Sequence, residues 1–311
     1  YGDKSITAKR SSINGSIQNL ENSSFQTSNV LNYTWSGKGH DVTAMVGQEY
    51  VNRWSRNFKA AAANFPNDDI GLGDLSLGLP TAVSSAENYD DKLLSFFTRV
   101  NYGFKDKYLF TASFRADGSS RFAPGHRWGT FPSVSAGWRI SGEKFMQPLQ
   151  DIVTDLKLRA GWGMNGNQGG FGNYAYMASM SVSKLPVSEG NLYPGLAIKP
   201  GSAANKELTW EKTSQWNLGL DLTMFDSRLS FSVDAYYKKT TDLLLTVSLP
   251  ENVVPSSVTR NDGEMVNKGM EFTLSSQNFK GNFQWNTDFN ISFNRNKLTK
   301  LGLNKVYYYA E

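Results

Sequence analysis

Few side chains in this 311-residue sequence have the chemistry of an active site. There is no cysteine, which excludes thiolate metal sites, disulfides and cysteine nucleophiles. The two histidines, His40 and His126, lie far apart in the chain, so a histidine-based zinc site is not expected. His40 is predicted to lie in a tight turn and His126 in a basic loop, and neither setting suggests a Ser–His–Asp triad. We therefore predict a protein that is not an enzyme and that has no catalytic residue, metal site or cofactor.

Three other groups of residues are candidates for chemistry. The oxygens of 67–69 and Asp74 are of the kind that binds Ca²⁺, but they lack EF-hand spacing, and a solvated loop is expected there. The glycine-rich stretch 165–173 lacks the Lys-Ser/Thr of a phosphate-binding loop. Glu207 and Glu211 would share one strand face, and the family resemblance described below explains them without glycosidase chemistry.

Net charge and hydropathy exclude further classes of protein. Lys and Arg exceed Asp and Glu by 32 − 28 = 4, an excess too small to indicate a nucleic-acid partner. An aromatic fraction of 13% is too high for a disordered chain. No apolar run approaches the ~20 residues of a transmembrane helix, and the start, YGDKSITAKR, does not resemble a signal peptide. The mean hydropathy of −0.44 suits a soluble protein, but also a transmembrane β-barrel, whose strands alternate.

Apolar and polar residues alternate along most of the chain. In residues 107–118, the even positions carry Tyr108, Phe110 and Phe114, while most odd positions are polar. A period of two predicts strands, and about eleven segments show it. The clearest others are residues 127–141, 156–164, 216–224, 229–238 and 283–293. The best helical candidate, residues 143–155, is short and contains Pro148.

Strand length and link length favour a membrane barrel over a soluble sandwich. Several segments are about twice the usual ~5–6 residues, and a membrane-spanning strand needs ~9–11. Short links are predicted at residues 36–40, 104–107, 225–228 and 277–282, and long links at residues 53–92, 117–127, 165–208 and 250–263. Transmembrane barrels alternate short periplasmic turns and long extracellular loops in this way. The order is consistent if the link at 143–155 is periplasmic and the longest loop holds an even number of strands.

One segment carries a specific family resemblance. Residues 115–146 contain the motifs DGSSRF from Asp117, RWG from Arg127, FPS from Phe131 and AGWR from Ala136. Further matches follow at residues 156–167, 208–212 and 263–271. Together these resemble the SusC/RagA family of TonB-dependent outer-membrane transporters from Bacteroidetes, in the order that the family shows and over nearly the whole chain.

The resemblance implies a fold, a location and partners. It implies an all-β, antiparallel transmembrane β-barrel of 22 strands in the bacterial outer membrane. About eleven of those strands are present, so residues 1–311 would be an internal part of a single barrel domain. The plug domain and the TonB box would lie outside this chain. The implied function is TonB-dependent uptake of a large nutrient, a glycan or a peptide. The implied partners are a SusD-like surface lipoprotein, TonB acting through the plug region, and outer-membrane lipid.

Two groups of side chains are candidates for contact with a plug or a substrate. Charged residues on the polar strand face would point into the barrel lumen: Arg99, Arg115, Asp117, Arg139 and Arg159. They contact the plug or line the substrate path, or else they form a hydrated network in the wall with no ligand role. Aromatic residues of the long links would stack on sugar rings, or pack among loops: Phe65, Tyr89, Phe171, Tyr174 and Tyr193. The alternative function is that of a soluble carbohydrate-binding β-sandwich without transport activity.

Overall fold

The computed structural model describes residues 13–66, 74–83, 87–184, 196–249, 255 and 257–301. This part of the chain holds thirteen strands and three short 3₁₀-helices. The strands are β1 (Asn14–Gly37), β2 (His40–Ala63), β3 (Leu79–Val83), β4 (Glu87–Phe104), β5 (Tyr108–Ser119), β6 (Trp128–Arg139), β7 (Val153–Asn167), β8 (Met180–Lys184), β9 (Leu196–Pro200), β10 (Glu211–Met224), β11 (Leu229–Ser248), β12 (Ser257–Lys280) and β13 (Gln284–Leu301). The helices are η1 (Leu75–Leu77), η2 (Ile140–Gly142) and η3 (Lys144–Leu149).

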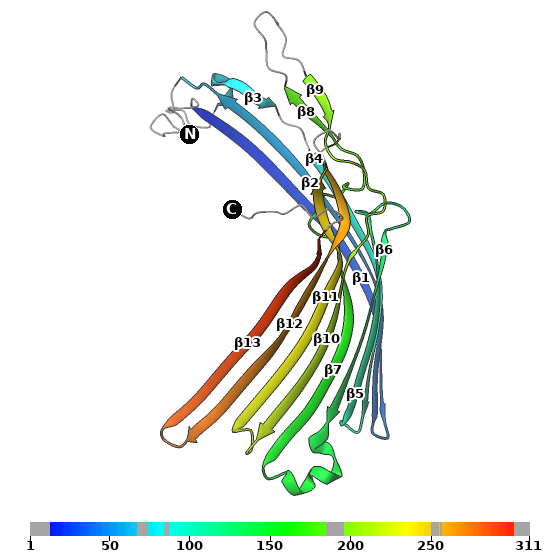
Figure 1. Cartoon of the computed structure of the whole chain (residues 1–311), viewed down its shortest axis with the longest axis vertical. Coiled ribbons are helices and arrows are strands. Elements are labelled where there is room, and N and C mark those ends of the chain that lie inside the picture. Colours follow the sequence, from blue (N-terminus) through cyan, green and yellow to red (C-terminus); the bar gives the residue numbers. More distant parts are fainter. Residues whose placement is uncertain are drawn as a thin grey trace, which may run out of the picture. The chain divides into compact units, whose positions relative to one another are not determined.

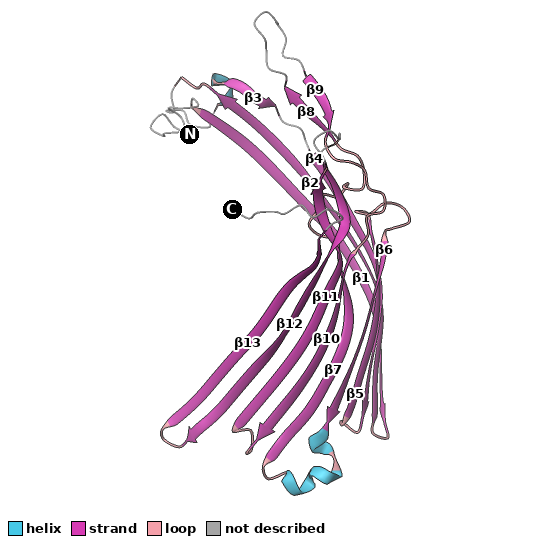
Figure 2. Ribbon diagram, viewed as in Figure 1, coloured by secondary structure: helices cyan, strands magenta, loops and turns pink. Residues whose placement is uncertain are grey.

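Eleven of the strands form one sheet (Figure 2). Ten of them run in the order β1-β2-β4-β5-β6-β7-β10-β11-β12-β13, and β3 pairs with β2. The remaining two, β8 and β9, form a separate antiparallel hairpin. Every strand neighbour in the main path is a sequence neighbour once that hairpin and β3 are set aside, which is the order of an up-and-down barrel. The prediction of an all-β antiparallel fold with about eleven strands is confirmed.

The chain divides into two compact units. The first holds residues Tyr1–Thr27 and Tyr50–Leu93, where described, and includes η1 and β3. In this unit β3 pairs with the end of β2, from Ala60 opposite Val83 to Ala63 opposite Leu79. The second unit holds residues Ser28–Glu49 and Leu94–Glu311, and therefore most of the sheet.

In the second unit the short turns lie at one end of the strands (Figure 1). The β1–β2 and β4–β5 hairpins turn through residues with positive φ, including Lys38, Gly39 and Lys105, as tight two-residue turns require. Backbone hydrogen bonds join neighbouring turns: Lys105 N donates to the Gly39 carbonyl at 2.6 Å, and Gln277 N donates to the Arg228 carbonyl at 2.8 Å. The four predicted short links are confirmed as turns or tight connections.

The longer links differ from the prediction in detail. The link expected at residues 53–92 is shorter than predicted, because β2 continues to Ala63 and β4 already begins at Glu87. Residues 143–155 contain the 3₁₀-helix η3, with Pro148 inside it, in place of an α-helix. Proline removes an amide donor and limits a helix to such short pieces. In its described residues the longest loop contains an even number of strands, β8 and β9, as its predicted orientation required.

The strand registers sort side chains onto two faces. One row across six strands is wholly apolar: Trp138, Leu158, Leu220, Val233, Phe272 and Ile291. The apolar face is largely uncovered, with Trp216 60% and Leu218 54% exposed. A β-sandwich would bury such a face against a second sheet, so the soluble-sandwich alternative is not supported. Within the described residues, no helix is both long enough and apolar enough to cross a membrane.

Candidate functional site

The polar face carries a charged cluster centred on Arg159 of β7. Its Nε donates to Asp221 Oδ2 at 2.6 Å and its Nη2 donates to Asp221 Oδ1 at 2.9 Å, which is a bidentate pair. Nη2 also lies 3.1 Å from Asp234 of β11. Ser232 Oγ donates to Asp221 at 3.0 Å and completes the cluster. Four side chains from three neighbouring strands are thus tied together across β10.

Gly219 makes the Arg159 cluster possible. It lies directly between Arg159 and Asp234 in the strand register, on the same face as both. A Cβ atom at this position would be 2.5 Å from Asp234 Oδ1 and 2.7 Å from Arg159 Cζ. Only glycine therefore lets the two charged groups meet above the strand that separates them. Alternation placed Arg159 on the polar face, but its partners on β10 and β11 and the role of the glycine emerged only from the register.

A second cluster is centred on Arg115 of β5. Arg115 Nε donates to both carboxylate oxygens of Asp117, at 2.7 and 3.0 Å. Its Nη2 donates to Ser95 Oγ at 2.8 Å and to Glu49 Oε2 at 3.2 Å, and its guanidinium lies 5.5 Å from the ring centre of Phe97. Ser95 and Asp117 are buried. The cluster joins β2, β4 and β5, and Glu49 and Ser95 are members that the sequence did not single out.

Between the two clusters the polar face is hollowed. A hollow of about 570 Å³ is lined in part by Arg99, Arg115 and Ser133, and another of about 490 Å³ by Arg159 and Gly161. Small side chains cause this, as Ser133 pairs across the strands with a glycine, Gly163. Arg99 is exposed, and within the described residues it has no recorded ion pair. It is the candidate arginine whose charge is available to a ligand.

Arg139 lies apart from these clusters, at the short-turn end of β6. Its Nε is 3.4 Å from Asp155 Oδ1, and Ser141 Oγ donates to the same oxygen at 2.6 Å. Nearby, Glu143 accepts from Tyr108 Oη at 2.7 Å and pairs with Lys107 at 3.2 Å. Arg139 therefore helps to fix the β6–β7 link.

The signature segment forms a small core at the other end of the strands. Phe122 is fully buried, and its ring centre lies 5.2 Å from that of Trp210 and 5.6 Å from that of Phe171. Trp210 Nε1 donates to the Arg127 carbonyl at 2.9 Å. Arg121 Nη1 donates to the Gln168 carbonyl at 3.2 Å. The motif residues thus hold the β5–β6 link against the start of the longest loop, at Gln168 and Phe171, and against Trp210, which follows it.

The five loop aromatics have different surroundings. Phe171 packs against Phe122 in the signature core, so it follows the alternative of packing among loops instead of stacking on a sugar ring. Tyr174 is 44% exposed, and Phe65 is partly buried, with its ring beside Gly78. Tyr89 belongs to β4, but its side chain lies outside the described part of the structure, and Tyr193 lies outside the described residues altogether.

The residues with possible metal or acid–base chemistry have structural partners. His40 Nδ1 is 2.8 Å from Tyr102 Oη, and His126 Nε2 is 3.5 Å from Glu207. Asp74 Oδ1 accepts from the backbone and the hydroxyl of Ser76 and caps η1. Residues 67–69 lie outside the described residues. In the described part of the chain no group of three His, Asp or Glu side chains is arranged to hold a metal ion.

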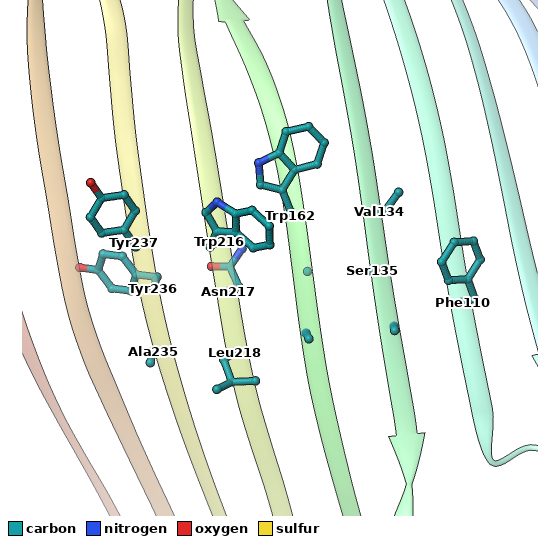
Figure 3. Close-up of a pocket in the computed structure, with 13 residues that line it drawn as sticks. Phe110, Val134, Ser135, Trp162, Trp216, Asn217, Leu218, Ala235, Tyr236 and Tyr237 are labelled. Carbon is teal, nitrogen blue, oxygen red and sulfur yellow. The ribbon is translucent and has the colours of Figure 1, made fainter.

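The apolar face has a hollow of its own, of about 520 Å³ (Figure 3). Trp162, Trp216 and Tyr237 are cross-strand neighbours along one edge of it. The next row contributes the small residues Ala160 and Ala235. Sequence alternation predicted an apolar face here. The hollow itself depends on the strand register, which brings small residues of neighbouring strands into one row.

Comparison with known proteins gives a consistent family. The chain matches the family described as TonB dependent receptor-like, beta-barrel, over residues 2–309. A TonB-dependent receptor of Formosa agariphila is 35% identical over 93% of this chain. The TonB-dependent receptor SusC of Bacteroides thetaiotaomicron is 39% identical over 70% of it. The structure of the RagAB peptide transporter is 30% identical over 93% of the chain, with a TM-score of 0.80.

The chain spans less than a third of each of these relatives: 29% of the Formosa receptor, 22% of SusC and 32% of the RagAB chain. The relatives are receptors and transporters and not enzymes, as predicted for this chain. Barrels of this type belong to the bacterial outer membrane, where the apolar face meets lipid and the polar face lines the interior. The chain therefore belongs to the TonB-dependent receptor β-barrel family and is an outer-membrane, SusC-like protein.

Proposed function

We propose that this chain forms part of the wall of a transporter that imports a large nutrient, a glycan or a peptide, across the outer membrane with energy delivered through TonB. The family match over residues 2–309 carries the proposal. The two-faced sheet supports it, because it has a lipid-compatible side and a charged, hollowed side. We further propose that residues 1–311 belong to a single 22-stranded barrel domain whose plug and TonB box lie outside this chain.

A SusD-like surface lipoprotein is the proposed partner, sitting over the long links. The similarity to SusC and to the RagAB peptide transporter supports this pairing. The signature core around Phe122 and Trp210 would hold the links in place beneath the partner. Tyr174, which is exposed, is the described loop aromatic best suited to stack on a sugar ring or a peptide side chain.

On the polar face we propose two separate roles. Arg115 and Arg159 are each paired with two carboxylates, so they stabilise the wall. Arg99, Asn165 and the serines of the larger hollow are proposed to line the substrate path or to meet the plug. Arg139 has a link-fixing role at the periplasmic end.

Deletion and complementation of the gene for the whole transporter tests the proposal. Uptake of labelled oligosaccharides and peptides is measured in intact cells, with and without a protonophore. Deletion is expected to abolish uptake of one of these substrates, and the wild-type gene is expected to restore it. Uptake of that substrate is also expected to stop when the proton gradient collapses. Uptake of both substrates that is unaffected by the deletion contradicts it. Co-purification of a surface lipoprotein with the tagged transporter tests the partner separately.

A further inference from the structure

One row of the membrane-facing side combines aromatic and basic residues. The register aligns Trp162, Trp216, Tyr237, Lys268 and Arg295 on five consecutive strands, β7 and β10 to β13. Directly paired residues share a face, so the two cations lie on the same side as the exposed apolar residues. Below this row, toward the short turns, the face is apolar. The row therefore marks the upper boundary of the apolar band, where aromatic girdles of membrane barrels lie.

The two cations of this row have no recorded acidic partner among the described residues. The nearest acidic side chain on the same face of β12 is Glu264, and Lys239 binds it at 3.0 Å. Lys268 and Arg295 are both exposed and are direct cross-strand neighbours. Two adjacent like charges repel one another, and a charge on the lipid side is unfavourable unless an anion or water meets it. The arrangement calls for an anion between the two side chains.

Two apolar hollows lie beside the cations, one on each side of Tyr237. Lys268, Arg295, Met270 and Phe293 line one hollow of about 480 Å³, which also reaches Tyr237. On the other side of Tyr237 lies the hollow of about 520 Å³, with Trp162 and Trp216 along its edge (Figure 3). The row beneath the aromatics contains Ala136, Ala160 and Ala235, which make the base of the hollow low, and Leu218 stands between Ala160 and Ala235.

We propose that this surface binds one phosphate-bearing membrane lipid. Lys268 and Arg295 hold the phosphate of the headgroup, and Tyr237 and Trp216 lie at the level of the headgroup–chain boundary. An acyl chain lies in the alanine-based hollow beneath the aromatic row. The charge complementarity of two uncompensated cations next to an apolar groove selects an anionic lipid over a zwitterionic one. The inference rests on the outer-membrane location and is independent of the transported substrate.

Native mass spectrometry of the whole transporter in detergent tests the site. The protein is titrated with phosphatidylglycerol and with phosphatidylcholine of the same acyl chains. The wild type is expected to retain the anionic lipid preferentially. The double variant Lys268→Gln, Arg295→Gln is expected to bind it about 30-fold more weakly, for two lost charges near the membrane surface. The matched control is Lys280→Gln, which removes a cation at the short-turn end of β12, away from Lys268 in the middle of the strand, and should retain wild-type binding.

A second variant tests the hollow proposed for the acyl chain without changing the charge of the site. Ala160→Leu fills the hollow, so it should weaken binding of long-chain phosphatidylglycerol but not of a short-chain form. Equal retention of both headgroups by the wild type overturns the proposal, as does wild-type retention by the double variant. If the double variant does not assemble, undiminished binding of the long-chain anionic lipid to Ala160→Leu overturns it. A transporter that fails the uptake test but retains preferential binding of the anionic lipid contradicts only the transport proposal and leaves the lipid site standing.

Discussion

Glycines opposite large side chains determine what the polar face can hold. Gly219 lets Arg159 reach Asp234 across a strand, and the ring of Tyr236 lies over Gly269 in the same way. A glycine in a strand interior is normally unfavourable, because it costs backbone entropy and offers no side chain to pack. Here the neighbouring side chain covers the glycine and is itself ordered by the contact. These glycines are therefore part of the wall's polar network.

Gly219→Ala tests this dependence directly. The added methyl group must displace either the Arg159 guanidinium or the Asp234 carboxylate, so we expect a loss of about 1–3 kcal/mol in unfolding free energy. Urea unfolding of the whole transporter, followed by tryptophan fluorescence, measures it. Gly172→Ala is the control, because no heavy atom lies within 4 Å of its added Cβ. Equal stability of the two variants would show that the cluster relaxes without cost.

Glu143 gives a prediction about pH. Hydrogen bonds from Tyr108 and Trp138, with help from Lys107, hold the pKa of Glu143 below its usual value. A carboxyl with a lowered folded-state pKa stabilises the fold fully above its unfolded pKa of about 4.3. That contribution disappears as the pH falls through the lower folded pKa. Glu143→Gln should therefore lower the thermal midpoint at pH 7, and the gap to wild type should close toward pH 3.

The control for Glu143 is Asp151→Asn, at an exposed position of the same link. It removes an equal charge without touching the Glu143 contacts, and its midpoint should follow that of the wild type at each pH. A gap between wild type and Glu143→Gln that stays constant from pH 7 to pH 3 contradicts the assignment. In that case the variant acts through packing of the β6–β7 link and not through ionisation.

At the scale of elements, alternation predicted strands well and their ends poorly. A period of two is visible in residues 107–118 because one face meets lipid and the other meets water. Residues 53–63 are rich in Ala and basic residues, which hides the period, yet β2 continues through them and its last four residues pair with β3. The Arg115 and Arg159 clusters were not predictable as clusters, since the partners that each arginine has on other strands lie 20 to 75 residues away and meet it only through the strand register.

The two ends of the strands should differ in accessibility from outside the cell. Single cysteines are introduced at Gly172, in the longest loop, and at Gly281, in the β12–β13 turn. Both positions have open space around an added Cβ, and this chain has no cysteine of its own. A membrane-impermeant maleimide should label Gly172→Cys in intact cells and Gly281→Cys only after permeabilisation. The reverse pattern would invert the predicted orientation.

At the scale of the whole molecule, the two faces of one sheet explain how a barrel wall can be apolar toward lipid and polar toward its interior. Each strand carries both surfaces, so the lipid side and the lined interior are fixed together by the register. A misplaced charge destabilises the barrel on the lipid side but not on the interior side. Arg or Lys on the lipid side costs about 2–4 kcal/mol at mid-membrane, whereas the same charge on the interior side is hydrated.

Adjacent residues on β12 test which side meets lipid. Phe272 lies in the apolar row and Thr273 on the polar face, where it pairs with Ser232. Phe272→Lys should destabilise the whole transporter by about 2–4 kcal/mol and reduce the heat-modifiable, folded band on a gel. Thr273→Lys should leave that band unchanged. Phe272→Leu controls for the lost contact with Phe293, and it should retain most of the folded protein. If Thr273→Lys were the damaging change, the polar face would be the one against lipid, and the lipid site inferred above would fail with it.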